Sequence, residues 1–333
     1  MIVFSTATAG SNRHLMEEIT VKMAGKKNKR VRVINFIDEM IGGAKSLNKE
    51  IDSSTLPQLD IKTLEMLKKT AFHKISDTIK ASPKIDYIID GHMSFWWRSG
   101  PISLIKINDF KEINPDFFVT IIAEPNYMLN NLKSKKEWTD KDINAYELTL
   151  WSELEKYTAD IVSEALGKEH YILGAHEDPS VLYDLMYSPK KLKVYVSFSM
   201  AHNEKGYKDL DQFLNRIKKY AIIFNPRTID LKAYYGTHDE RLQTLVYNQT
   251  VRRDYGLIEQ SDIVIVYLPT LVYSSGVDSE RLYAHNSGKP VLLYFPFEMY
   301  SPFTPYFVDK MYKDEDELVR RVKEMYTGER FYK

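Results

Sequence analysis

The chain has 333 residues, with 46 basic and 46 acidic side chains and no cysteine. The length predicts two domains, and the balanced charge argues against a large nucleic-acid-binding surface. The lack of cysteine excludes disulfides and thiolate metal ligands, and no apolar run approaches the ~20 residues of a membrane-spanning helix. We therefore expect a cytoplasmic protein without nucleic-acid or membrane partners.

The chain begins with a predicted short strand over residues 2–5, and a loop from Ala7 to His14 follows it. A phosphate-binding P-loop of sequence G-x-x-x-x-G-K-[ST] would stand here, because its glycines let backbone N–H groups cradle phosphates. The four diagnostic positions instead hold Ala7, Asn12, Arg13 and His14. The segment is therefore a degenerate P-loop, which consists of Gly10, Ser11, Asn12, Arg13 and His14.

Longer segments of this half form a second pattern. They include RVINFIDEMI, LPQLDIKTLEMLKKTAFHKISD, YIIDGHMSFWWRSGP and INPDFFVTIIAEPNYML. Together they resemble the archaeal-type adenylate kinases, over about the first 187 residues. The resemblance implies a P-loop kinase-like fold, in which helices cover both faces of a parallel sheet.

Three interpretations of this half are open. It binds a nucleotide without catalysis, with Arg13 and a helix N-terminus attracting phosphate; it is a scaffold or dimerisation module; or it is an unusual kinase, with Arg13 in place of lysine and Asp90 handling magnesium. Because the loop is degenerate, we expect no kinase activity. The aromatic-cationic cluster at residues 95–98 either stacks on a base or packs a loop onto its own domain.

A polar, proline-containing segment at residues 187–193 separates a helical stretch from a new strand. It predicts one domain at residues 1–188 and another at residues 192–333. Both halves alternate strands and helices, which is typical of parallel sheets with helices on both faces. We therefore expect an α/β protein of two three-layer domains.

In the second half, residues 263–268 form a continuous apolar run, which predicts a strand buried on both faces of a parallel sheet. Ligands of such sheets bind beyond the carboxyl ends of the strands, where the segment SSGVDSE (274–280) would place Glu280 in a cleft. Gly276 would let backbone N–H groups approach an anion, and Ser279 would cap the helix that carries Glu280.

A second carboxylate, Asp254, lies on the helix that precedes this strand. Two carboxylates near one cleft suggest that one is ionised and attacks, while the other holds or passes a proton. The alternative is that Asp254 caps or salt-bridges a helix, and that Glu280 is a solvated helix residue.

Four segments of this half form a family pattern: VYVSFSMAHNE, VRRDYGLIEQSDIVIVYL, SSGVDSERLYAHNSGKPVLLYFP and MYKDEDELVRRVKEMY. They resemble the nucleoside 2-deoxyribosyltransferase superfamily, and within it the 2'-deoxynucleoside 5'-monophosphate N-glycosidases of the Rcl type. The resemblance implies a flavodoxin/Rossmann-like fold. It also implies that Glu280 attacks the anomeric carbon, that Asp254 assists at the sugar and base, and that Tyr195 lies near the sugar.

The resemblance further implies a phosphate site. Transferases that act on free nucleosides usually carry an aspartate six residues before the nucleophile, where this chain has Ser274, as the monophosphate glycosidases do. Ser197 and Ser199 stand where the family has a small phosphate loop, although the arginine that often follows is missing. Ser301 matches a serine that such enzymes lend to the phosphate site of the partner subunit, so a homodimer or larger homo-oligomer is implied.

The sequence therefore predicts an enzyme that hydrolyses the N-glycosidic bond of a (deoxy)nucleoside 5'-monophosphate and releases free base and sugar phosphate. Base exchange through the same nucleophile and a non-catalytic nucleotide sensor are the alternatives. We expect no cofactor and no metal at this site, because the eight histidines show no metal-ligand spacing with carboxylates. The cofactor expected elsewhere is a nucleotide in the first domain.

Overall fold

The computed structural model describes residues 1–45, 51–98, 100–103, 105–135, 138, 141–199, 204–229, 239–272, 274–298 and 301–328. The chain divides into two compact units. Unit 1 comprises Met1–Leu182 and Ile229–Gln249, and unit 2 comprises Tyr183–Thr228 and Thr250–Lys333. The sequence-predicted boundary between residues 188 and 192 stays a prediction. None of the described helices is both long and apolar enough to cross a membrane.

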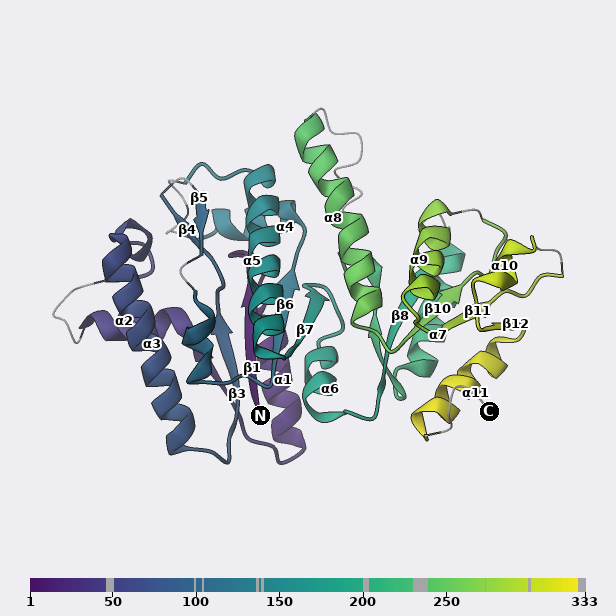
Figure 1. Cartoon of the computed structure of the whole chain (residues 1–333), viewed down its shortest axis with the longest axis horizontal. Helices are drawn as coiled ribbons and strands as arrows, with labels where there is room; N and C mark the ends of the chain where they lie inside the picture. The colour runs from purple at the N-terminus through teal and green to yellow at the C-terminus, as the bar shows by residue number, and fades with distance from the viewer. Residues whose placement is uncertain are drawn as a thin grey trace. The chain divides into compact units, whose positions relative to one another are not determined.

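The elements up to residue 187 alternate strands and helices (Figure 1). The strands are β1 (Ile2–Ala7), β2 (Val31–Asn35), β3 (Asp86–Gly91), β4 (Phe95–Trp97), β5 (Gly100–Ile102), β6 (Phe117–Ile122) and β7 (Glu169–Gly174). The helices are α1 (His14–Lys26), α2 (Phe36–Lys45), α3 (Ile61–Ala81), α4 (Pro125–Lys133), α5 (Ala145–Leu166) and α6 (Ser180–Tyr187), with short 3-10 turns at Leu56–Gln58 and Ile107–Lys111.

The main sheet of unit 1 has five parallel strands in the order β2-β3-β1-β6-β7, and β4 and β5 form a separate antiparallel pair. Every residue of β6 is buried, which requires cover on both faces of the sheet. Because β1 lies between β3 and β6, the loop after β1 opens at the point where the chain changes direction across the sheet. Parallel sheets bind ligands at such a point.

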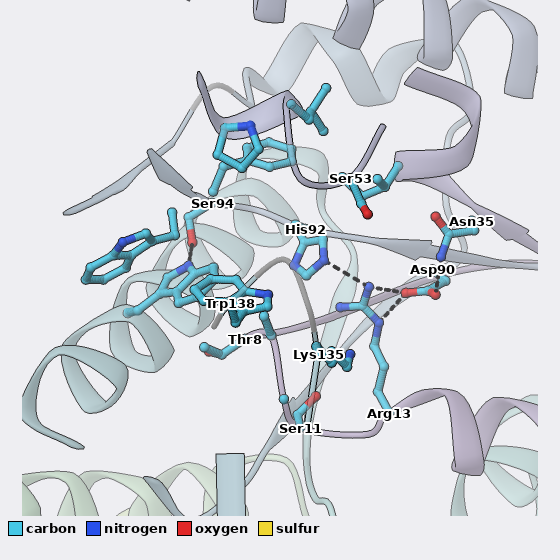
Figure 2. A pocket seen from close by; sticks show the side chains of 18 of the residues that line it. Thr8, Ser11, Arg13, Asn35, Ser53, Asp90, His92, Ser94, Lys135 and Trp138 are labelled. Carbon is cyan, nitrogen blue, oxygen red and sulfur yellow. Dashed lines mark hydrogen bonds and ion pairs between the residues drawn. The ribbon is translucent and has the colours of Figure 1, made fainter. Parts of the chain in front are cut away.

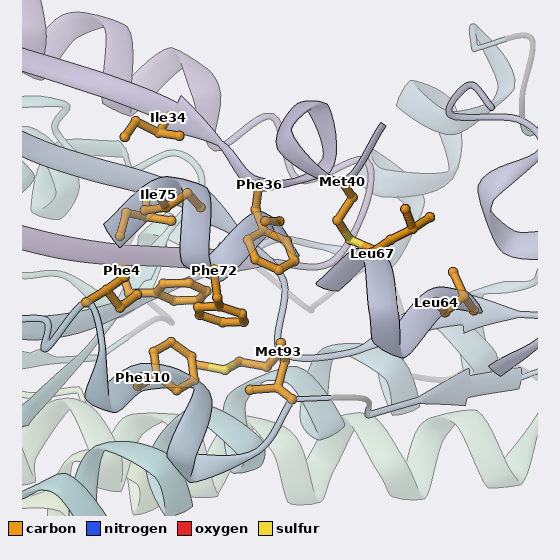
Figure 3. Packing of buried hydrophobic residues seen from close by; sticks show 14 of the residues in the cluster. Phe4, Ile34, Phe36, Met40, Leu64, Leu67, Phe72, Ile75, Met93 and Phe110 are labelled. Carbon is orange, nitrogen blue, oxygen red and sulfur yellow. The ribbon is translucent and has the colours of Figure 1, made fainter. Parts of the chain in front are cut away.

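The core of unit 1 is rich in aromatic rings (Figure 3). The Phe4 ring packs edge-on against Phe110 with ring centroids 4.8 Å apart, and Phe72 meets Phe110 in the same way at 5.3 Å. Edge-to-face contacts are the favoured arrangement of aromatic pairs. These contacts fix β1 against the helices and so hold the loop that follows it.

The elements from residue 192 onward repeat the alternation. The strands are β8 (Leu192–Phe198), β9 (Ala221–Phe224), β10 (Ile263–Tyr267), β11 (Val291–Tyr294) and β12 (Lys310–Tyr312). The helices are α7 (Glu204–Ile217), α8 (Glu240–Glu259), α9 (Ser275–Asn286), α10 (Phe303–Tyr306) and α11 (Glu315–Tyr326), with a 3-10 turn at Pro226–Thr228.

The sheet of unit 2 is also five-stranded and parallel, in the order β12-β11-β10-β8-β9. Strand β9 lies on one side of β8, and β10, the next strand in sequence, lies on the other side. The carboxyl ends of β8 and β10 therefore mark the switch point of this sheet. All five residues of β10 are buried, as the apolar run at residues 263–268 predicts. The predicted α/β class with two parallel sheets is thereby confirmed.

Candidate functional site

Strand β8 and helix α9 bring a serine and a glutamate together in unit 2. Tyr195 and Ser197 are two residues apart on β8, so they point to the same face of the sheet, and both are fully buried. Helix α9 carries Glu280, which is half-buried. The Ser197 Oγ donates a hydrogen bond to Glu280 Oε2 at 2.5 Å. The pair lies at the carboxyl-terminal edge of the sheet, where the sequence predicts the site.

The second carboxylate, Asp254, is held by its neighbour in sequence. Arg253 Nε and Nη2 contact Asp254 Oδ1 at 2.9 and 2.8 Å. Their side chains are 5% and 13% exposed, so this ion pair is largely shielded from water. Asp254 also lies close enough to Glu280 for its charge to raise the pKa of the glutamate. The sequence analysis left open whether Asp254 forms a salt bridge or acts together with Glu280. In the structure it does both, because it pairs with Arg253 and its charge also acts on Glu280.

Burial and mutual repulsion hold a proton on this carboxylate pair. Desolvation raises the pKa of Glu280, and Asp254 raises it further, to about 8, despite the hydrogen bond from Ser197. Burial also raises the pKa of Asp254, but Arg253 opposes that shift. Of the two carboxyl groups, Glu280 therefore holds a proton more readily than Asp254 does.

The Tyr195 phenol stays neutral in this setting. Burial raises the pKa of Tyr195 well above its ordinary value, and the charges of Asp254 and Glu280 add to the shift. Its hydroxyl lowers the pKa of Glu280, so it faces the carboxylate. No hydrogen bond of full geometry joins this hydroxyl to any of the described residues. A neutral phenol beside a carboxyl can orient a bound hydroxyl group without competing for the proton.

Helix α9 begins differently from the sequence prediction. Its N-cap is Ser274, whose Oγ accepts a hydrogen bond from the Val277 backbone N–H at 3.4 Å, so the prediction that Ser279 caps the helix was wrong. The helix starts earlier because a serine in extended conformation precedes it directly. A Cβ at Gly276 would meet Ser274 Oγ at 3.7 Å, an ordinary contact, so space within the protein does not require glycine there.

The two remaining predicted phosphate contacts lie in different surroundings. Ser199 is buried directly after β8, and the following residues 200–203, with Met200, Ala201 and His202, lie outside the described residues. Ser301 is exposed at the start of α10, and its Oγ accepts a hydrogen bond from the Phe303 backbone N–H at 3.3 Å. The structure therefore brings together Tyr195, Ser197, Asp254 and Glu280, and it records no contact between Ser301 and these four.

Arg253 is the residue of this site that sequence reasoning missed. It is buried, and it lowers the pKa of both carboxyl groups. Neighbouring residues on a helix point in different directions, so adjacency to Asp254 did not predict the ion pair. The arginine was visible in the VRRD segment, but only the packed site shows that its guanidinium turns back to the aspartate.

Unit 1 contains a cavity of about 420 Å³ around the degenerate P-loop (Figure 2). The loop lines it together with polar residues of neighbouring elements: Asn35, Asp38, Ser53, Asp90, His92 and Lys135. All four tryptophans of the chain, Trp96, Trp97, Trp138 and Trp151, also line it. Phe95, Trp96 and Trp97 of the predicted aromatic-cationic cluster therefore border a cavity, while Arg98 lies over the Trp97 ring, 4.3 Å from its centroid.

Arg13 lies at the centre of the polar wall, where dashed lines in Figure 2 mark its contacts. Its Nε and Nη2 both contact Asp90 Oδ1. Its Nη1 donates to the Ala7 carbonyl oxygen at 3.1 Å, and its Nη2 lies 3.3 Å from His92 Nε2. Asn35 Nδ2 donates to the other Asp90 oxygen at 2.8 Å. The two residues that the kinase interpretation assigns to phosphate and magnesium thus bind each other.

The degenerate loop itself is a tight turn against α4. Gly10 has φ +88°, and a Cβ there would lie 2.6 Å from the Met128 carbonyl oxygen, so only glycine fits. Asn12 also has a positive φ, of 58°. The Ser11 backbone N–H donates to the Thr8 carbonyl oxygen at 3.2 Å. At least one N–H group that a phosphate cradle would use is therefore occupied within the loop.

A buried glutamate from α5, which the sequence did not single out, supports the floor of the cavity. Glu155 accepts hydrogen bonds from the backbone N–H groups of Met93 and Ser94 at 2.7 and 2.8 Å, and from the hydroxyls of Ser94 and Thr6. Burial raises the pKa of Glu155 to about 7 despite these donors. Burial, and then the charge of Arg13, lower the pKa of His92 well below its usual value, so His92 is neutral.

Within the described part of the chain, no group of three or more histidine, aspartate or glutamate side chains is arranged to hold a metal ion. A magnesium ion at Asp90 would have to displace Arg13 and Asn35 from its carboxylate.

Comparisons with known proteins give distant similarities of fold. The chain matches no protein-family profile and no curated protein. A 2-deoxyribosyltransferase from Bacillus psychrosaccharolyticus shares 17% identity over 38% of this chain and 89% of its own, with a TM-score of 0.30. A CMP N-glycosidase from Clostridium botulinum shares 18% identity over 39% and 98%, with a TM-score of 0.28. A shikimate kinase from Bacteroides thetaiotaomicron shares 12% identity over 56% and 98%, with a TM-score of 0.35. These similarities carry no conclusion about activity.

The Arg13–Asp90 ion pair gives the first prediction. Asp90→Asn removes the nearer of two acidic partners of the buried guanidinium and leaves Glu17, 3.9 Å away, as the other, so we expect a loss of about 2 kcal/mol in the free energy of unfolding. Chemical denaturation followed by circular dichroism measures this loss. The double variant Arg13→Met with Asp90→Leu removes both charges and should recover most of it. A double variant no more stable than Asp90→Asn would contradict a stabilising role of charge pairing.

Proposed function

We propose that unit 2 hydrolyses the N-glycosidic bond of a (deoxy)nucleoside 5'-monophosphate, with Glu280 as the nucleophile. The observation that carries the proposal is the hydrogen bond of Ser197 to Glu280, beside Asp254, at the switch point of the sheet. Support also comes from the family motifs that bear these residues, since the resemblance assigns Glu280 and Asp254 to the reaction. The sequence alternatives of base exchange and of a non-catalytic sensor are separated by experiment below.

The reaction proceeds in two displacements. In the first, a Glu280 oxygen forms a bond to C1' while the C1'–N bond breaks, and the electron pair of that bond leaves with the base. The base nitrogen takes up a proton, and the sugar remains attached to Glu280 as an ester. In the second, a water oxygen attacks C1' and releases the Glu280 carboxylate, which gives the sugar phosphate. The proton of the water passes to a basic side chain of the site, not to the departed nucleobase.

The proton held by the carboxylate pair suits the first displacement. Glu280 must lose its proton to attack, and the departing base must gain one. Asp254 has a raised pKa, so it is a competent carrier between the two. As positive charge develops at C1', the carboxylate form of Glu280 is stabilised and its pKa falls. The neutral Tyr195 hydroxyl then orients the sugar, which is the role that the family resemblance implies.

The 5'-phosphate is assigned to the end of β8 and the start of α9. Ser274 is the N-cap of α9, so the first backbone N–H groups of this helix and its dipole favour an anion. Gly276 lies in the first turn, where a Cβ would meet Ser274 Oγ at 3.7 Å, an ordinary contact. Ser199, directly after β8, and Ser301, offered by a second subunit, complete the proposed phosphate contacts. A homo-oligomer would be needed for the Ser301 contribution.

Glu280→Gln tests the nucleophile. The amide keeps the size of the side chain and can still accept a hydrogen bond from Ser197, but it cannot form the ester, so we expect release of base to fall at least about a thousandfold. The measurement is chromatography of free base after incubation with ribo- and deoxyribonucleoside monophosphates. Glu317→Gln, the same change at an exposed position of α11, is the control and should retain activity.

If the Glu280→Gln variant releases base at the wild-type rate, Glu280 is not the nucleophile. If the wild-type chain releases no base from any monophosphate, the result favours a non-catalytic nucleotide sensor. Addition of a second free base separates hydrolysis from exchange, because only a transferase yields a new nucleotide.

The pH dependence tests the coupling of the two carboxylates. Because the first displacement uses the proton that the carboxylate pair holds, kcat/KM should be steady below pH about 8 and fall as pH rises through that value. Asp254→Asn removes a charge that raises the pKa of Glu280, so the fall in the residual activity should move to lower pH. Glu317→Gln, at an exposed position of α11, should leave the fall in place. A fall that does not move in Asp254→Asn would show that the two carboxylates are not coupled.

Ser274→Asp tests the phosphate assignment. Aspartate is as good an N-cap as serine, so α9 should remain stable, while the new charge should repel a 5'-phosphate. We expect kcat/KM for the monophosphate to drop relative to the unphosphorylated nucleoside by about tenfold or more. The ratio of the two kcat/KM values is the measurement, and an unchanged ratio would place the phosphate elsewhere.

A further inference from the structure

The proposed reaction leaves the cavity of unit 1 without a role. Its volume of about 420 Å³ falls in the range of small-molecule sites. Aromatic rings form part of its wall. Trp97 and Trp138 are partly exposed, and Trp138 packs against Trp151 with ring centroids 5.8 Å apart. Trp96 and Trp151 lie 5.6 Å apart and belong to the buried core behind them. The Trp151 Nε1 donates to Ser94 Oγ at 2.9 Å, which holds that ring in place. Such a wall favours a flat ligand that stacks on rings.

The polar part of the lining is poorly suited to phosphate. The Arg13 guanidinium already contacts Asp90, the Ala7 carbonyl oxygen and His92. Besides its histidines, the lining has two cationic side chains, Arg13 and Lys135, and two anionic ones, Asp38 and Asp90. A triphosphate would bring several negative charges towards two carboxylates, without a glycine-rich N–H cradle or a P-loop lysine to compensate them.

Polar side chains of the lining can meet the edge of such a ring. Asn12 is partly exposed and Ser53 is exposed, and both line the cavity. An amide and a hydroxyl can each donate or accept a hydrogen bond. They match the ring nitrogens, carbonyl oxygens and amino groups of a nitrogen heterocycle.

We propose that this cavity binds a planar nitrogen heterocycle of the nucleobase class, as free base or nucleoside, and discriminates against phosphorylated forms. The ring stacks on the partly exposed Trp97 and Trp138, and its edge hydrogen-bonds with Asn12 and Ser53. The Arg13–Asp90 pair stays closed and blocks the place where a P-loop would hold phosphate. The inference does not depend on the reaction of unit 2, although a free base is the product proposed for that unit.

The placement of the tryptophans provides a selective test. All four lie in unit 1 and line the cavity, so tryptophan fluorescence reports on this cavity and not on the carboxylate site. The full chain with Glu280→Gln, which should leave nucleotides intact, is titrated with adenine, cytosine, adenosine, cytidine, AMP, CMP and magnesium-ATP. A tryptophan analogue in solution corrects for absorption by the ligands. We expect saturable quenching by a base or nucleoside, with the phosphorylated forms binding at least about tenfold more weakly.

A steric variant locates the binding. Ser53 is exposed at the rim of the cavity, so Ser53→Phe adds bulk at the mouth without disturbing the core and should weaken base binding at least about tenfold. Lys80→Phe adds the same ring at an exposed position of α3 outside the cavity and should bind like the parent. Tighter binding of AMP, CMP or magnesium-ATP, unchanged binding in Ser53→Phe, or no saturable quenching by any base or nucleoside would each overturn the proposal. Loss of base release alone would instead count against the proposed reaction of unit 2.

Discussion

Two buried carboxyl groups that lie close together are the constraint on which the chemistry proposed for unit 2 depends. They repel each other when both are ionised, which adds to the effect of burial in raising the pKa of Glu280. Arg253 compensates the charge of Asp254, so Glu280 holds a proton more readily than Asp254 does. The parallel sheet brings Ser197 on β8 to the same edge at which α9 begins after β10, and so places it beside Glu280. A glutamate that keeps its proton to a higher pH than usual is the direct result.

At the equivalent place in its sheet, unit 1 has two charged groups of opposite sign instead of two carboxyl groups. The loop after β1 opens between β3 and β6, where ligands of parallel sheets bind. Here the charged groups are of opposite sign, and Arg13 and Asp90 neutralise each other. The charged groups of this cavity are therefore already paired with each other, while aromatic rings line another part of it. Two sheets of one architecture thus present different chemistry, which is why function has to be read from the residues of each site.

Much of this organisation is predictable from local patterns. A strand buried on both faces is recognisable as an uninterrupted apolar run, as at β10, and a degenerate P-loop is recognisable because its lysine position is an arginine. The start of α9 was harder to predict, because both Ser274 and Ser279 are acceptable caps and only the path of the chain before the helix decides between them. Glu155 was not predicted to matter, since its four donors come from β1 and from the segment after β3.

The sequence by itself determined which groups are available: carboxylates at positions 254 and 280, an arginine in place of the P-loop lysine, and the alternation that builds two parallel sheets. Only the tertiary structure decided what those groups do to one another. Arg13 meets Asp90 from 77 residues away, and Ser197 meets Glu280 from 83 residues away. The charge state of an ionisable group depends on burial and on neighbours within a few ångströms, and both arise only when distant segments pack together.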